Sequence, residues 1–176
     1  MRDLSKFSAG KIRISLKFRV IIWFTIRFFL ESYFLIPSRM KISILRTAGA
    51  NIGQGCVIRS LKVHFPWNLE IGNNSWIGEE VWIINHEKIK IGSDVCISQR
   101  SIICSSSHDY RSVSLDYAHK PIDVKDGAWI CFDAKVLPGV TIGECSVVSA
   151  GEVVRKSIPD YSMLVGGEIH PIDPPK

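Results

Sequence analysis

Aliphatic residues recur every six positions along most of the chain after residue 50. A helix would space them three or four residues apart and a half-buried strand two apart, so neither element explains the pattern. A hexapeptide period is typical of a parallel β-helix, in which three units of one short strand and one turn complete a triangular coil. The recurring residues, which we expect to point into the prism, are Ile52, Ile58, Ile71, Ile77, Ile83, Ile91, Ile97, Ile103, Val124, Ile130, Val136, Ile142, Val148 and Val154.

Glycine and other small residues occupy fixed positions in the same repeat. Glycine follows the aliphatic residue in pairs such as Ile71-Gly72 and Ile142-Gly143, and Ser75 and Ala128 each stand four residues after an aliphatic. Such residues suit the tight corners between short strands. We therefore predict an all-β protein whose β-helix covers residues 47–165, followed by a C-terminal tail over residues 166–176.

Two interruptions of the register are also informative. Ile83 and Ile91 are eight residues apart, and Ile103 and Val124 are 21 apart, one coil plus three residues. The second interruption predicts an inserted loop over residues 104–121, which contains the sequence Ser-Ser-Ser-His-Asp-Tyr at 105–110. Loops that leave a rigid scaffold often carry function.

The first 46 residues differ from the rest of the chain. They hold ten Lys or Arg residues against two acidic ones, a net charge of +8, whereas the whole chain of 176 residues carries +5. The aromatic-rich pattern over residues 16–45 predicts helices, which Pro37 divides in two. Arg27 and Glu31 would be costly inside a bilayer, so a spanning helix is disfavoured. An interfacial membrane helix and a cap on the end of the prism both remain open.

Composition narrows the classes of protein that fit the chain. Apolar residues make up 46% of the chain, enough for a core. The β-helix region shows no nucleic-acid signature, and no signal-peptide cleavage site follows the N-terminal apolar stretch. The five cysteines form no CxxC pair and are odd in number, so we interpret them as small buried apolar residues in a reducing compartment.

Several motifs carry a family resemblance. They are Leu45-Arg46 with Gly49-Ala50-Asn51-Ile52-Gly53, Trp76-Ile77-Gly78-Glu79, Ser107-His108-Asp109-Tyr110, Pro121-Ile122, Gly127-Ala128-Trp129-Ile130, Pro138-Gly139-Val140-Thr141-Ile142-Gly143 and Val153-Val154-Arg155-Lys156-Ser157-Ile158-Pro159. With them the chain resembles the hexapeptide acyltransferases, most closely the colanic-acid-type O-acetyltransferases of exopolysaccharide synthesis. The resemblance implies a left-handed β-helix, a homotrimer with active sites between subunits, and acetyl-CoA as the donor, with no metal.

The resemblance also assigns the catalytic base to His108. A sugar hydroxyl is a poor nucleophile and must lose its proton as it attacks a thioester, and an imidazole of pKa near ~6.5 suits that task. Asn85 and His86, at the earlier register break, are candidates for binding the acceptor, although a corner amide that satisfies its own turn would look the same. Asp109 and Tyr110 are further acceptor-binding candidates.

For the donor, the positions that match the family are Trp129, Phe132 and Ala150, with Arg155 and Lys156 near the phosphates of CoA. A solvated basic pair and an ordinary corner tryptophan are the alternatives. The C-terminal segment departs from the family pattern, because Glu168 and Asp173 stand where neutral or basic residues are expected. This departure concerns the adenine and ribose-phosphate end of the CoA site.

Together these observations predict an enzyme that transfers acetyl from acetyl-CoA to a sugar hydroxyl of an exopolysaccharide, capsule or related glycan precursor. The alternatives are another small hydroxyl acceptor, such as an antibiotic or serine, a zinc-dependent carbonic-anhydrase-like β-helix, and a non-catalytic scaffold. We expect a cytoplasmic homotrimer without nucleic-acid partners, placed at the inner face of the cell membrane if the basic segment binds anionic lipid.

Overall fold

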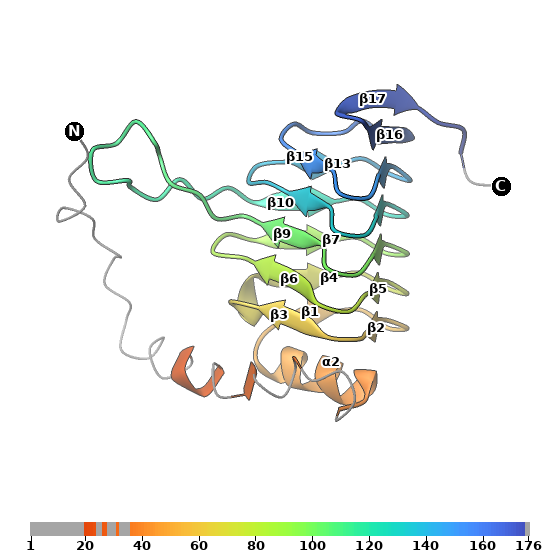
Figure 1. The fold of residues 1–176 in the computed structure, drawn as a ribbon. Coiled ribbons are helices and arrows are strands. Elements are labelled where there is room, and N and C mark those ends of the chain that lie inside the picture. The colour runs from red at the N-terminus through yellow and green to blue at the C-terminus, as the bar shows by residue number, and fades with distance from the viewer. Residues whose placement is uncertain (1–19, 24–25, 28–30, 32–35, 175–176) are drawn as a thin grey trace.

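Three parallel β-sheets form the sides of a triangular prism (Figure 1). The computed structural model describes residues 20–23, 26–27, 31 and 36–174. The chain visits sheet A, sheet B and sheet C in turn and begins each new coil directly above the previous one. The expected β-helix with an N-terminal helical segment and an inserted loop is thereby confirmed.

The strands are short, and each pairs with the strand one coil earlier and one coil later. Sheet A contains β1 (Asn51–Ile52), β4 (Leu69–Ile71), β7 (Ile89–Ile91), β10 (Ile122–Val124) and β13 (Thr141–Ile142). Sheet B contains β2 (Val57–Ile58), β5 (Trp76–Ile77), β8 (Cys96–Ile97), β11 (Trp129–Ile130), β14 (Val147–Val148), β16 (Ser162–Val165) and β17 (Glu168–Pro171). Sheet C contains β3 (Leu61–Val63), β6 (Val81–Ile84), β9 (Ile102–Cys104), β12 (Lys135–Val136) and β15 (Val153–Val154).

The aliphatic residues of the six-residue repeat fill the prism. Ile77 stacks on Ile97 and Ile97 on Ile130 in the parallel register of sheet B. All fourteen residues of the predicted series are at most 4% exposed. Burying a side chain of this size from water contributes roughly 1.5–3 kcal/mol, so the stacked columns are the main source of stability.

The corners depend on small residues because neighbouring coils approach closely there. The Ser75 hydroxyl is buried and donates to the Gly92 carbonyl of the next coil at 2.8 Å. A Cβ atom on Gly143 would lie 2.3 Å from the backbone nitrogen of Asp160, which leaves no room for any other residue. The six-residue pattern therefore reflects packing at the corners as well as in the core.

The N-terminal region covers the first coil. Helix α2 (Ser38–Thr47) starts directly after Pro37, as predicted, and buries Ile42 and Leu45 in the core cluster. Trp23 is 2% exposed and its indole N–H donates to the Val63 carbonyl at 3.2 Å. The described residues of this region thus cap the open end of the prism. Within the described residues, no helix has the length and apolar character needed to cross a membrane.

The other end of the prism carries a hairpin. Strand β17 turns back and pairs antiparallel with β16, so part of the predicted tail belongs to sheet B. Glu168, at the start of β17, lies 3.7 Å from His170 and remains largely exposed.

The five cysteines form no disulfide. Cys56 is buried, but the other four are half-buried, so the interpretation of all five as buried residues was wrong for these four. A short 3-10 turn at Pro66–Asn68 shapes one corner of the first coil.

Candidate functional site

The predicted loop is an arm that leaves the corner between β9 and β10 and projects from the prism (Figure 1). Its two strands are held by backbone hydrogen bonds, from Lys120 N–H to Ser105 O at 3.0 Å and from Ala118 N–H to Ser107 O at 2.9 Å. His108 and Tyr117 face each other in an antiparallel bridge. The arm therefore has a defined backbone that fixes where its side chains point.

His108 is exposed on this arm and its ring is oriented by the backbone. Its Nδ1 lies 2.5 Å from the carbonyl oxygen of Leu115. A carbonyl only accepts hydrogen bonds, so in the neutral ring the proton belongs on Nδ1 and the lone pair on Nε2. Leu115 has a φ of 54°, a left-handed conformation that is unfavourable for a leucine.

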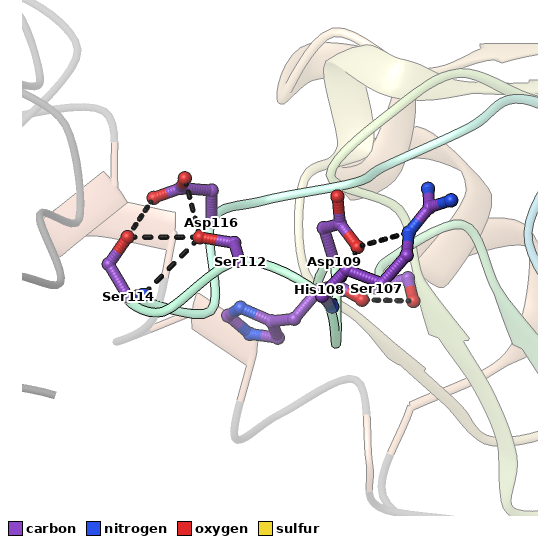
Figure 2. Close-up of polar contacts among 7 residues, drawn as sticks. Ser107, His108, Asp109, Ser112, Ser114 and Asp116 are labelled. Atoms are coloured by element: carbon purple, nitrogen blue, oxygen red, sulfur yellow. Dashed lines mark hydrogen bonds and ion pairs between the residues drawn. The ribbon is translucent and has the colours of Figure 1, made fainter. Parts of the chain in front are cut away.

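The tip of the arm is tied together by one carboxylate. Asp116 accepts hydrogen bonds from the hydroxyls of Ser112 at 2.7 Å and Ser114 at 2.8 Å (Figure 2). These two hydrogen bonds lower the pKa of Asp116, because both stabilise its charged form. Since Asp116 directly follows Leu115, the same contacts restrain the carbonyl that orients His108.

A series of ring contacts joins the arm to the corners of the coils below it. His64 lies 5.8 Å from His86, and His86 lies 4.8 Å from His119, measured between ring centroids. Tyr117 follows at 4.5 Å from His119 and at 5.0 Å from His108. We call these five side chains the ring series. It connects three successive levels of the same edge of the prism.

The histidines of the prism edge are held in the neutral form. Burial lowers the pKa of His64 to about 4, helped by the nearby charges of Arg27 and His86. Burial is also the largest cause that lowers the pKa of His86 and of His119. The ring of His119 accepts a hydrogen bond from the Ser107 backbone N–H through Nδ1 at 3.1 Å, which fixes its tautomer.

The acceptor candidates are placed differently from one another. Asn85 is fully buried, and its side chain bonds the backbone of Phe65 at both ends, at 2.9 and 2.6 Å. These contacts are the ones expected if Asn85 is a corner amide that bonds the backbone of a turn, the alternative to acceptor binding. His86 lies in the ring series. Asp109 bonds Arg111, whose backbone and side-chain donors lower the pKa of that carboxyl, and Tyr110 is 74% exposed on the arm.

The donor candidates lie on another part of the prism. Trp129 is in β11 of sheet B, 48% exposed, with its indole N–H on the Ser98 hydroxyl at 3.0 Å. Phe132 and Ala150 are exposed at the corners between sheets B and C, and the Arg100 guanidinium lies 5.5 Å from the Phe132 ring centroid.

Arg155 and Lys156 follow β15 directly and are exposed. Trp129, Phe132 and Ala150 lie along sheet B and its corner with sheet C, whereas the arm leaves the corner between sheets C and A. Within one chain, His108 and these three donor candidates therefore stand at different corners.

The histidines do not form a ligand cage. The ring series places His64, His86 and His119 one after another, and His108 joins it through Tyr117. Among the residues that the structure describes, no three His, Cys, Asp or Glu side chains are grouped so that they could hold a metal ion. His64 and His86 are 22 residues apart, and this spacing places their rings in contact on one edge of the prism.

Sequence reasoning missed Leu115, Tyr117 and His119. Tyr117 and His119 alternate on the returning strand of the arm, a period-two pattern that could have indicated side chains on one face. Nothing in the sequence marks Leu115, because its role rests on its backbone carbonyl. The resulting site offers an exposed, oriented imidazole beside a wall of neutral rings, an arrangement suited to proton abstraction from a hydroxyl group.

Comparison with known proteins gives relatives along nearly the whole chain. The chain is 36% identical over 162 residues to the Escherichia coli K12 protein WcaF, provisionally named a colanic acid biosynthesis acetyltransferase, and the match covers 90% of this chain and 89% of WcaF. A protein of Schizosaccharomyces pombe, provisionally named an acetyltransferase, is 33% identical over 61% of this chain and 54% of its own length. No family model matches the chain.

Solved structures share the fold. A hexapeptide-repeat acetyltransferase of Vibrio cholerae in complex with acetyl-CoA superposes with a TM-score of 0.79 at 20% identity and covers 97% of this chain and 96% of that one. A maltose O-acetyltransferase of Clostridium difficile 630 gives a TM-score of 0.78 at 22% identity, with 99% of both chains covered. At these identities the similarity shows the β-helix architecture.

Proposed function

The chain belongs to the hexapeptide-repeat acetyltransferases, in the group of WcaF, and from this premise we propose that it transfers acetyl from acetyl-CoA to a sugar hydroxyl. The acceptor would be an exopolysaccharide, capsule or related glycan precursor, as the name of WcaF suggests for that protein. The observation that carries the proposal is the orientation of His108 by the Leu115 carbonyl, which presents Nε2 as a base.

The proposed reaction needs one base and one acid, and His108 supplies both. As the sugar oxygen attacks the thioester carbonyl, its proton moves to Nε2 of His108. The Leu115 carbonyl, at 2.5 Å from Nδ1, stabilises the imidazolium that forms. When the tetrahedral intermediate collapses, the C–S bond breaks and the same proton is returned to the sulfur of CoA.

Removing the base tests this assignment. His108→Ala should lower the rate of thiol release from acetyl-CoA by ~10²-fold or more, with an unchanged far-UV spectrum and melting temperature. His170→Ala is the matched control, because that histidine is exposed on β17 at the far end of the prism. A His108→Ala enzyme with near-wild-type turnover would overturn the assignment.

The donor would lie against Trp129, Phe132 and Ala150, with Arg155 and Lys156 near its phosphates. In support, the two aromatic rings are about half exposed, Trp129 on sheet B and Phe132 at its corner with sheet C. Because the arm leaves a different corner, a complete site requires the arm of one subunit and the donor surface of another. We therefore propose a homotrimer, the closed arrangement that such heterologous contacts favour.

Mixed assemblies test the shared site. His108→Ala and Trp129→Ala subunits should each have low activity alone, and activity should return when the two are coexpressed and assembled together, because Trp129 lies on sheet B, away from the corner that the arm leaves. A variant pair that shows no recovery, or light scattering that shows a stable and active monomer, would contradict a site between subunits. A screen of sugars, serine and hydroxyl-bearing antibiotics with the wild-type enzyme would separate the acceptor classes.

The basic N-terminal segment would bring the enzyme to the inner, anionic face of the cell membrane. Its net charge of +8 and its aromatic residues provide the two attractions of an interfacial helix, each basic residue contributing on the order of 1 kcal/mol. Ile22 and Met40, more than half exposed beside the cap, add apolar surface.

Vesicle co-sedimentation tests the membrane proposal. We expect binding to anionic vesicles that weakens with salt, weaker binding to neutral vesicles, and loss of binding in a chain that starts near Arg46. If the full-length protein does not bind anionic vesicles at low salt, the membrane proposal is wrong, and the N-terminal segment acts only as a cap on the prism.

A further inference from the structure

A groove of about 420 Å³ lies on sheet A at the foot of the arm, within the size range of small-molecule sites. Three lysines from two segments of the chain line it. Lys88 comes from the corner before β7, Lys90 from the middle of β7, and Lys120 from the last residues of the arm. Strands β10 and β13 complete its walls with Asp123 and Thr141.

The charges of the groove are only partly balanced by the protein. Lys88 forms an ion pair with Glu70 at 2.6 Å, and Asp123 forms one with Lys125 at 2.5 Å. Within the part of the chain that the structure describes, neither Lys90 nor Lys120 forms an ion pair with a carboxylate. Two ammonium groups therefore remain for an anion.

A second observation points to a hydroxyl-bearing ligand. The Oδ1 atom of Asp123 is buried and has no hydrogen-bond partner, although a carboxylate oxygen accepts strongly. Asp123 lies beside Lys90 in the parallel register of β7 and β10, so the unsatisfied acceptor and the unpaired cation are neighbours. A molecule with both a phosphate and a sugar hydroxyl would satisfy both.

The residues of the groove adjoin those of the candidate active site in the sequence. Lys88 follows His86 by two residues, and Lys120 follows His119 by one, so the same two segments build the ring series and the groove. Tyr117, which pairs with His108, precedes Lys120 by three residues, or about 10 Å of extended strand. One elongated substrate could reach from the groove toward His108.

We propose that this groove binds the phosphate or pyrophosphate of the acceptor, and that the acceptor is therefore a phosphate-bearing sugar. The inference rests on the proposed sugar acetyltransferase activity and narrows its substrate class. Lys90 and Lys120 bind the anion, and Asp123 accepts a hydrogen bond from the adjoining sugar. A nucleotide sugar and a lipid-linked pyrophosphoryl sugar present the same chemistry.

Binding measurements without turnover test the groove. Calorimetry with inorganic pyrophosphate and glucose 1-phosphate should show roughly tenfold or greater weakening in the Lys90→Gln/Lys120→Gln variant, because two charge-assisted contacts are lost. Lys62→Gln is the matched control, since Lys62 is the middle residue of the three-residue strand β3 as Lys90 is of β7, and it should change binding less than twofold. Unchanged pyrophosphate binding in the double variant would overturn the proposal.

Two further measurements distinguish the proposal from its rivals. CoA should bind the double variant with unchanged affinity; an equal loss for CoA would assign the groove to the donor and overturn the proposal. Asp123→Ala should weaken glucose 1-phosphate relative to pyrophosphate, because only the former offers a hydroxyl. If the ratio of the two affinities is unchanged in Asp123→Ala, this carboxylate does not bind a sugar hydroxyl. The proposal that the groove binds a sugar phosphate would then be overturned.

The source of the phosphate is decided by competition. UDP-glucose and a short-chain polyprenyl pyrophosphoryl glucose would each be titrated against glucose 1-phosphate, and the tighter competitor identifies the natural class. Displacement by neither would overturn the proposal. If phosphate-bearing sugars bind but thiol release stays at background with all of them, the acetyltransferase proposal fails while the groove assignment stands.

Discussion

The prism places Ile83, Ile97 and Ile130 at 0% exposure and pairs its strands with a neighbour on each side through most of the stack. The arm, by contrast, has no residue of the core cluster between Ser105 and Pro121. Its order comes from backbone hydrogen bonds between its two sides, from the carboxylate of Asp116 at its tip and, at its base, from the ring contacts of Tyr117 and His119. Burial of aliphatic columns thus stabilises one region, and polar and ring contacts stabilise the other.

This difference separates stability from chemistry. A repeated coil extends the same buried columns and keeps its outward side chains close to the sheet surface, so it cannot carry a side chain away from the prism. The arm provides that place, at the cost of a left-handed Leu115 and few apolar contacts. Changes in the arm should therefore affect turnover, and changes in the columns should affect folding.

The largest expected effect comes from removing the arm. Replacing residues 106–119 by Asn-Gly is feasible because Lys120 N–H already bonds Ser105 O at 3.0 Å, and this dipeptide suits a two-residue hairpin turn. Acetyl transfer should be lost, while the free energy of unfolding in urea should change by less than about 1 kcal/mol. Loss of the cooperative unfolding transition would show that the arm is part of the folding unit.

A cavity in one of the buried columns should lower the stability of the fold, which removal of the arm should leave almost unchanged. Ile130 is fully buried between Ile97 and Val148 in sheet B, so Ile130→Ala should lower the free energy of unfolding by about 2–5 kcal/mol. Ile130→Val, the control that keeps the branched shape, should cost only about 0.5–1.5 kcal/mol. If both variants unfold like the wild type, the columns are not the source of stability.

Acid should weaken the prism edge. Burial lowers the pKa of His64 from 6.5 to about 4, so between these values the unfolded chain binds a proton that the folded chain does not. Stability is therefore full above pH 6.5, falls as the pH drops toward 4, and levels off below it. The loss should be about 1–2 kcal/mol, less than the full shift implies because the ring is half-exposed.

The matched variants for the acid effect are His64→Phe and His170→Phe. The first keeps a ring in the series but removes the titrating group, so the decline of stability between pH 6.5 and 4 should become shallower. The second changes an exposed histidine of β17 and should leave the decline unchanged. Equal profiles in the wild type and both variants would contradict the role of His64.

The smallest effect is expected at the arm tip. Asp116→Ala removes the acceptor for the Ser112 and Ser114 hydroxyls and loosens the Leu115 carbonyl, so kcat should fall about three- to tenfold with little change in the KM for acetyl-CoA. Asp116→Asn retains one acceptor oxygen, so its kcat should fall less than that of Asp116→Ala. A larger change in KM than in kcat would indicate a direct role in substrate binding.

The six-residue period alone was enough to predict the parallel β-helix, its buried columns and the position of the arm, because each coil repeats the same local packing. Pro37 likewise marked the start of α2. The motif Ser107-His108-Asp109-Tyr110, through the family resemblance, predicts His108 as the base.

Other features depend on contacts between successive coils or across the arm, which no local pattern encodes. The chain returns to the same edge of the prism only after about 20 residues, so the neighbours of His86 and Lys90 lie far away in sequence. The structure therefore assigned Asn85 to a corner of the prism and grouped the lysines around one groove. It also showed that a backbone carbonyl orients His108, a role that any residue type at position 115 could fill if it adopts the required φ, and so one that the sequence cannot reveal.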